Sequence, residues 1–261
     1  MRADAQGGHL GPPLVVDPRL DHVLGEHPAV QQEFNTVLDR FAKGPLTVEL
    51  VNPATKKREQ IRLPRSNFVE RIRLAMYNPG TQSFIPFIIH RAFLNDYVPW
   101  EVAAVRFSPG AGVARGMYFT VTCSEGVRFI TDKELVEETR STFVGEERVK
   151  RHMEACQEWP KGEIPASYID PVKSDVPVLM ISGEADGSSP IWFGENAVKF
   201  LSNGRQVKIR YYGHQMNGPC VQDIFQKFIA AGSSKNLDTS CTEMIRRPPF
   251  ATELPRQLAL E

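Results

Sequence analysis

Asp186 and His214 are the residues of this 261-residue chain whose types and spacing best suit catalysis. Each follows an apolar run, Val176–Ser182 for the aspartate and Val207–Tyr212 for the histidine. A carboxylate can hold an imidazole in one tautomer, while the imidazole takes a proton from a nucleophile and returns it to the leaving group. The pair therefore predicts the acid and base of a Ser-His-Asp triad.

Each of the two residues also has an ordinary structural interpretation. An aspartate in GEADGSSP can be an ordinary turn residue, or it can cap the helix that Pro190 opens. A lone histidine is more often a surface residue than a catalyst. However, two successive strand ends with one helix between them have neighbouring loops, so the two residues together favour the catalytic interpretation.

No serine of the sequence lies in a G-x-S-x-G motif, the sharp strand-to-helix turn that exposes a nucleophilic hydroxyl. Ser124, in CSEG, lacks the flanking glycines of such a turn. Ser188 and Ser189 lie beside Asp186, where a helix cap explains them. No residue supports the further hypothesis that another nucleophile was recruited.

Glu125 is a third candidate for the site, because it follows the run MYFTVTC (Met117–Cys123), which predicts a buried strand. A carboxylate at the same sheet edge would bind the free α-amino group of a substrate, which favours an aminopeptidase over a plain esterase. The alternative interpretation is that Glu125 is a solvated glutamate in a loop, without a role in binding.

The elements that must position these residues alternate regularly in the second half of the chain. Two successive β-α units are predicted from strands and helices at Val176–Ser182, Ile191–Leu201, Gln206–Tyr212 and Val221–Ala231. The run VPVLMIS is apolar on both faces, as expected of a parallel strand that helices cover on each side. Together with the strand predicted at Met117–Cys123, these make three strands. Three are too few for a parallel sheet covered on both faces, so the others are missing or come from another chain.

The first half of the chain is predicted to be largely helical and to form a lid or cap. We divide the chain into a flexible lead-in, a helical lid with a β-hairpin, a C-terminal α/β portion and a tail, at residues 1–27, 28–107, 108–245 and 246–261. Inside the lid we expect a helix from Val30 to Phe41, a hairpin over Leu46–Leu63 and further helices beginning near Ser66 and Pro79. A Gly/Pro-containing linker is expected at Ser108–Gly116.

Composition and charge argue against several classes of partner. There are 31 basic and 31 acidic residues, so the net charge is zero and no long-range field attracts nucleic acid or an anionic membrane. No apolar run approaches the roughly 20 residues of a membrane span, and MRADAQGGHLGPP lacks the apolar stretch of a signal peptide. As it stands, the sequence predicts a cytoplasmic protein without a cofactor.

The four cysteines allow three pairings, and buried free thiols are the alternative. No CxxC motif or His/Cys cluster occurs in the sequence, so we expect no zinc site. A bridge between Cys220 and Cys241 would fasten the helix after His214 to the tail and contribute about 3 kcal/mol.

The run from PVLMISGEADGSSP through GHQMNGPCVQDIFQKFIAAGSSKNLDTSC resembles a known domain. It is similar to the TAP-like C-terminal domain of the tripeptidyl and prolyl aminopeptidase branch of the α/β-hydrolases, with the elements G-x-x-D-x-x-[ST]-P, G-H and G-P-C…S-C. VTCSEGVRF and EACQEWP resemble the preceding segment, and VNPATKK, AMYNPGT and LPRSNF resemble the lid. The resemblance covers residues 28–245, approximately.

This resemblance implies an α/β fold, namely the C-terminal part of an α/β-hydrolase sheet with a mainly helical lid. It implies a secreted serine hydrolase, aminopeptidase-like or carboxylesterase-like, with Asp186 and His214 in its triad. It also implies Cys123–Cys156 and Cys220–Cys241 bridges. The family's N-terminal half, with the first strands, oxyanion hole and nucleophile elbow, has no counterpart in this sequence. Gly126 stands where many relatives carry an acidic residue.

Two hypotheses follow. In the first, the chain is the lid and C-terminal half of a serine hydrolase that transfers an acyl group from a small peptide or ester to water and needs the missing half. In the second, it is a non-catalytic fragment of such an enzyme that binds a partner or self-associates through an unfinished sheet edge.

Overall fold

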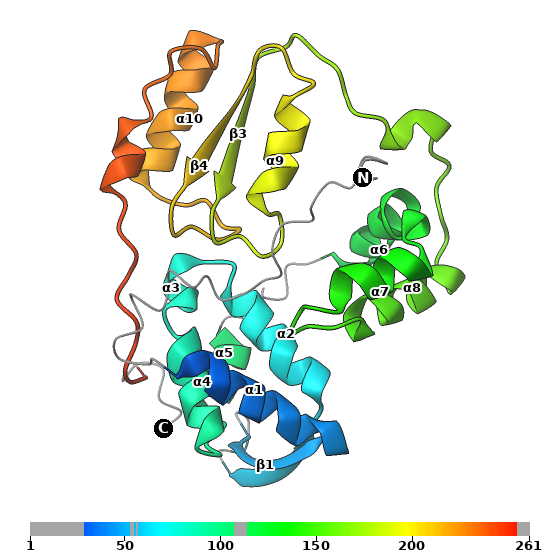
Figure 1. Ribbon diagram of the computed structural model, residues 1–261, viewed down its shortest axis with the longest axis vertical. Helices are drawn as coiled ribbons and strands as arrows, with labels where there is room; N and C mark the ends of the chain where they lie inside the picture. The colour runs from blue at the N-terminus through cyan, green and yellow to red at the C-terminus, as the bar shows by residue number, and fades with distance from the viewer. Residues whose placement is uncertain (1–28, 53–54, 56, 107–113, 255–261) are drawn as a thin grey trace. The chain divides into compact units, whose positions relative to one another are not determined.

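The computed structural model describes residues 29–52, 55, 57–106 and 114–254 (Figure 1). The predicted lead-in at 1–27 and most of the predicted linker at 108–116 lie outside this part of the chain. The described residues form two compact units. One contains residues up to 74 together with 86–169, and the other contains 75–85 together with 170–252.

The first unit is mainly helical and carries one antiparallel hairpin. The hairpin pairs β1 with β2 from Leu46↔Leu63 to Val51↔Arg58, as the alternating sequence predicts. The elements of this unit are α1 (Val30–Arg40), η2 (Phe41–Lys43), β1 (Leu46–Val51), β2 (Arg58–Leu63), α2 (Arg65–Ala75), α4 (Ile85–Phe93), α5 (Val98–Arg106), α6 (Arg115–Glu125), η3 (Val127–Phe129), α7 (Asp132–Thr139), α8 (Glu147–Glu158) and η4 (Ala166–Ile169).

Aromatic side chains form the core of this unit. Phe68 of α2 is fully buried, and its ring lies 5.5 Å from Phe41 and 6.3 Å from Trp100 of α5. The indole Nε1 of Trp100 donates a hydrogen bond to the carbonyl oxygen of Phe68 at 3.2 Å. Burial of rings from helices far apart in the sequence holds this unit together, since each ring removes a large apolar area from water.

Residues Met117–Cys123 are helical, so the predicted strand there is wrong. They belong to α6, in which the hydroxyls of Thr120 and Thr122 donate to carbonyl oxygens four residues earlier. The β-branched and aromatic residues that suggested a strand are a weak preference that tertiary packing overrides. Here the packing includes the Cys123–Cys156 disulfide, which fastens α6 to α8.

The second unit is built on two parallel strands. Its elements are α3 (Pro79–Gln82), β3 (Val178–Gly183), α9 (Ile191–Val198), β4 (Gly204–Ile209), α10 (Pro219–Ala231) and η5 (Ser240–Met244). Strand β3 pairs with β4 from Val178↔Gly204 to Gly183↔Ile209. The two β-α units predicted from the sequence are therefore present, although the sheet has two strands and not three within the described residues.

Helices α9 and α10 cover opposite faces of the strand pair β3–β4 (Figure 1). Val207 and Ile209 of β4 form a buried cluster with Val221 of α10. The alternate residues face α9, where the Gln206 amide donates to the carbonyl oxygen of Ile191 at 2.9 Å. Alternation along the strand thus gives one apolar face and one polar face.

Two disulfides are present, in the pairing that the resemblance implied. Cys123–Cys156 lies in the first unit, with the Cα atoms 5.2 Å apart. Cys220–Cys241 joins the first turn of α10 to η5, with the Cα atoms 5.8 Å apart. Of the helices in the described ranges, none combines the length and apolarity that crossing a membrane requires.

Candidate functional site

Asp186 and His214 lie together at the carboxyl edge of the strand pair. Strand β3 ends at Gly183, and the following turn is fixed by hydrogen bonds from Glu184 N to the Ile209 oxygen and from Ala185 N to the Tyr212 oxygen. Strand β4 ends at Ile209, five residues before the histidine. Because adjacent parallel strands end at the same edge, the two loops meet there.

The imidazole and the carboxylate are hydrogen-bonded. His214 Nδ1 lies 3.1 Å from Asp186 Oδ2. The Asp186 side chain is 4% exposed and that of His214 is 43% exposed. A carboxylate only accepts hydrogen bonds, so Nδ1 carries the proton and donates it, which leaves the lone pair of Nε2 available. This is the tautomer that a general base requires.

The second carboxylate oxygen is also held in place. Asp186 Oδ1 accepts hydrogen bonds from the backbone N–H groups of Ser188 at 2.7 Å and Ser189 at 3.0 Å. The aspartate therefore fixes its own turn and at the same time binds the histidine, but it does not cap α9, whose N-cap position Pro190 has no side-chain capping hydrogen bond. The two interpretations are compatible because each uses a different oxygen.

The structure shows no hydrogen bond between His214 Nε2 and Ser124, Ser188 or Ser189. Ser189 Oγ lies 3.5 Å from His214 Nδ1, the nitrogen that already binds the carboxylate. Ser188 Oγ accepts a hydrogen bond from the Tyr77 hydroxyl at 3.3 Å. Ser124 belongs to the other unit, where it is buried and accepts a hydrogen bond from Gly162 N at 2.8 Å.

Tyr77 contacts the histidine and was not singled out by the sequence. The two ring centroids are 5.0 Å apart, with 49° between the ring planes. The tyrosine precedes α3, a four-residue helix that begins with Pro79 as predicted and is capped by Asn78 Oδ1 accepting from Gly80 N. No local signal marks Tyr77, because 137 residues separate it from His214 in the chain and only folding brings them together.

Glu125 is the last residue of α6, so its predicted position after a strand is wrong. It lies in the helical unit, where its carboxylate accepts a hydrogen bond from the Tyr168 hydroxyl. This hydrogen bond raises the pKa of Tyr168, because it stabilises the protonated phenol. The helix ends at Gly126, whose N–H donates to the Thr122 oxygen.

Cys123, Cys156 and His152 offer ligand atoms within 4.8 Å of one another. A cysteine binds a metal as a thiolate, and these two sulfurs are bonded to each other. The imidazole has other partners, because His152 Nε2 lies 2.8 Å from Thr122 Oγ1 and Nδ1 lies 3.3 Å from the Tyr118 hydroxyl. In this oxidised state the cluster is a packing contact.

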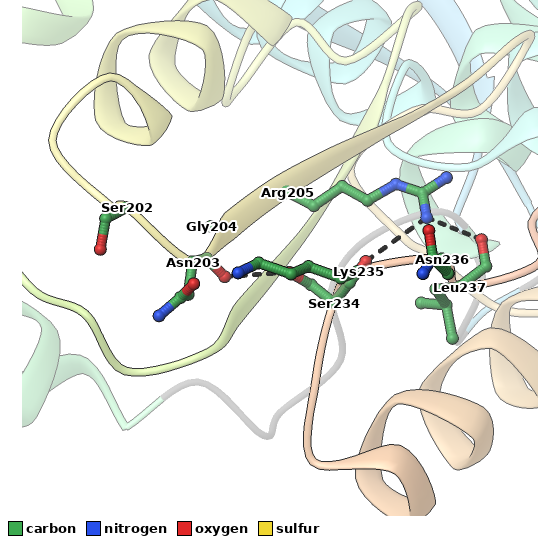
Figure 2. A pocket seen from close by; sticks show the side chains of 8 residues that line it. All are labelled: Ser202, Asn203, Gly204, Arg205, Ser234, Lys235, Asn236 and Leu237. Atoms are coloured by element: carbon green, nitrogen blue, oxygen red, sulfur yellow. Dashed lines mark hydrogen bonds between the residues drawn. The ribbon is translucent and has the colours of Figure 1, made fainter.

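A cleft of about 690 Å³ lies at the opposite end of β4 from His214 (Figure 2). It is lined by Ser202, Asn203, Gly204, Arg205, Ser234, Lys235, Asn236 and Leu237. Figure 2 shows the Arg205 guanidinium reaching the loop after α10, where Nη1 donates to the Leu237 oxygen at 2.6 Å. Arg205 Nη2 donates to Thr239 Oγ1 at 3.2 Å. The arginine thus ties this loop to the strand, which gives it a structural role.

Comparison with known families places the pair in a recognised domain. A family model described as TAP-like protein matches residues 141–241, a range that includes both Asp186 and His214. Searches of curated proteins and of solved structures gave no match. The matched range contains both strands, the helices that cover them and the Cys220–Cys241 bridge. Residues 141–241 of this chain are therefore a TAP-like C-terminal domain of the α/β-hydrolase superfamily.

Proposed function

We propose that this chain supplies the acid–base half of a serine hydrolase that transfers an acyl group from a small peptide or ester to water. The observation that carries the proposal is the hydrogen bond between His214 Nδ1 and Asp186 Oδ2 at adjoining strand ends of the TAP-like domain. His214 Nε2 takes the proton of the nucleophile and returns it to the leaving group. Asp186 holds the tautomer and stabilises the imidazolium.

The serine nucleophile and the oxyanion hole come from a segment outside these 261 residues, because no G-x-S-x-G occurs here. The free edge of β3 supports this, since the sheet has only two strands in the part of the chain that the structure describes. Residues Val178–Ser182 are each only partly buried, whereas a parallel strand inside a complete α/β sheet is covered on both faces. We infer that further strands of the hydrolase complete this sheet and that the helical unit is its lid.

The two disulfides support an extracytoplasmic location, because such bridges persist in oxidising compartments and are rare in the cytosol.

Glu125 remains the candidate for binding the α-amino group of a peptide substrate. If it has that role, Glu125→Gln lowers activity on an aminoacyl-arylamide and leaves activity on a p-nitrophenyl ester unchanged.

The test of the proposed function is co-expression of this chain with a G-x-S-x-G-bearing N-terminal segment from a TAP-like protein. Hydrolysis of a p-nitrophenyl ester and an aminoacyl-arylamide is then measured. We expect activity only when both parts are present. His214→Ala should lower the rate by several orders of magnitude, and Asp186→Asn by about 10⁴-fold, because the amide favours the wrong tautomer.

His90→Ala is the matched control for this experiment. The side chain of His90 is 36% exposed, and its Nδ1 lies 2.9 Å from the carboxylate of Glu33 in the helical unit. Its removal should leave the rate unchanged. Activity that survives loss of His214, or no activity in the combined protein, would contradict the proposal.

A non-catalytic binding or self-associating protein is the second candidate, and the same free edge of β3 favours it. The unpaired N–H and C=O groups of an edge strand can pair with another copy of the chain, and Val176, just before β3, is 60% exposed. This hypothesis expects a stable dimer of the isolated chain in sedimentation experiments. A dispersed monomer contradicts it.

A further inference from the structure

We propose that Tyr77 is a positioning residue for His214, holding the imidazole against Asp186 so that Nε2 stays in a catalytic orientation. The inference rests on the proposed function and adds a residue from outside the matched range of 141–241. Tyr77 belongs to the segment Ala75–Ile85, which lies in sequence between two helices of the other unit but packs in the unit of the strand pair.

One hydrogen bond does not fix an imidazole that is nearly half exposed. The Asp186 carboxylate restrains one ring nitrogen of His214, and Ser189 Oγ, at 3.5 Å, lies at the limit of a hydrogen bond to that nitrogen. Rotation about the bonds of the histidine side chain stays possible unless its ring is packed. The Tyr77 ring, with its centroid 5.0 Å away, supplies that packing.

Tyr77 is itself attached to both loops of the site. Its carbonyl oxygen accepts a hydrogen bond from Gln215 N at 2.8 Å, directly after the histidine. Its hydroxyl donates to Ser188 Oγ at 3.3 Å, and the N–H of Ser188 donates to Asp186 Oδ1 at 2.7 Å. Tyr77 therefore links the loop that carries the acid with the loop that carries the base.

The segment that presents Tyr77 is short and internally hydrogen-bonded. Thr81 Oγ1 donates to the Ala75 oxygen at 2.6 Å. Asn78 caps α3 through its Oδ1 and donates through Nδ2 to Gln215 Oε1 at 3.2 Å. Gln82 Nε2 donates to the Ala185 oxygen at 3.3 Å, one residue before the aspartate. A tyrosine on such a rigid turn restrains a neighbouring ring better than one on a loose loop.

The contact also suits the charge that develops during the reaction. When His214 takes the proton of the nucleophile it becomes a cation. A cation within about 6 Å of an aromatic centroid is attracted by the ring, and the rings here are 5.0 Å apart. Tyr77 thus favours the orientation of the imidazole and the cationic intermediate state together.

The test is an NMR measurement of the imidazole tautomer on the full chain labelled with ¹⁵N, with the His214 signals assigned from His214→Ala. In the wild type we expect well-separated signals for a protonated Nδ1 and an unprotonated Nε2. We also expect a nuclear Overhauser effect between the Tyr77 and His214 rings. Tyr77→Leu should move the two nitrogen signals toward each other as the tautomers mix. Tyr77→Phe, which keeps the ring, should restore the wild-type separation.

Phe193→Leu is the matched control, because it removes a partly exposed ring from α9 in the same unit. Its His214 signals should match the wild type. Unchanged His214 signals in Tyr77→Leu overturn the proposal, as does the absence of the ring-to-ring Overhauser effect in the wild type, a measurement that needs no variant to fold. Neither readout involves catalysis, so failure of the hydrolase assay would refute the proposed function and leave the positioning result standing.

Discussion

A methyl group on Gly213 would lie 2.2 Å from the carbonyl oxygen of Met76. It would also lie 2.7 Å from the carbonyl oxygen of Tyr77. Both neighbours are backbone atoms, so they cannot rotate away as a flexible side chain does. Because the segment 75–85 packs directly on the loop that carries His214, the residue before the histidine has to be a glycine.

Gly213→Ala should therefore separate this segment from the loop that carries His214. We expect the free energy of unfolding of the strand-pair unit to fall by about 1–3 kcal/mol, the usual effect of overpacking, as measured by urea denaturation. The wild-type Overhauser effect between Tyr77 and His214 should also disappear. Gly116→Ala is the control, because a methyl group there meets nothing within 4 Å and alanine suits the first turn of α6, where Gly116 lies. Equal stability of the two variants would contradict the packing argument.

Loss of the Cys220–Cys241 bridge should destabilise the unit that holds His214. The bridge closes a loop of 21 residues, for which the chain-entropy model gives about 3 kcal/mol. The double variant Cys220→Ser, Cys241→Ser should therefore unfold at a lower denaturant concentration than the wild type. Adding a reducing agent should lower the stability of the wild type further than that of the variant, which retains Cys123–Cys156 alone. A midpoint unchanged by the double substitution would show that the bridge is not needed.

His152 should make the helical unit less stable in mild acid. Burial, and then the neighbouring Arg148 cation, lower the pKa of His152 from its ordinary value near 6.5. Between the lowered pKa and about pH 6.5 the unfolded chain therefore binds a proton that the folded protein does not bind. The free energy of unfolding then decreases as the pH falls from about 6.5 toward the lowered pKa, and it is independent of this group above 6.5.

The measurement is thermal denaturation at pH values of about 7.5 and 5.5. The wild type should lose more stability between the two pH values than His152→Gln, whose amide can still bond to Thr122 and does not titrate. His90→Gln serves as the comparison, because this variant keeps His152 and should retain the part of the pH dependence that His152 contributes. The same pH dependence in the wild type and in His152→Gln would rule out a contribution from this residue.

Local sequence patterns were sufficient for the framework around the candidate site. The alternation in Leu46–Leu63 predicted the hairpin, and the apolar runs before Asp186 and His214 predicted β3 and β4 to within three residues of their ends. These predictions succeeded because the spacing of apolar residues and the presence of turn residues are properties of neighbouring positions in the sequence. The prediction of a strand at Met117–Cys123 failed because the β preference of single residues is weaker than the effect of tertiary packing. The predicted position of Glu125 after that strand was wrong for the same reason.

The sequence by itself determined that an aspartate and a histidine follow successive strands of a TAP-like domain, since motif and periodicity are both local. Only the tertiary structure decided that they share a hydrogen bond, that Tyr77 packs on the imidazole and that Gly213 must lack a side chain. Those relationships join residues up to 137 positions apart. They depend on the close approach of two backbones, for which a linear pattern of residue types contains no signal.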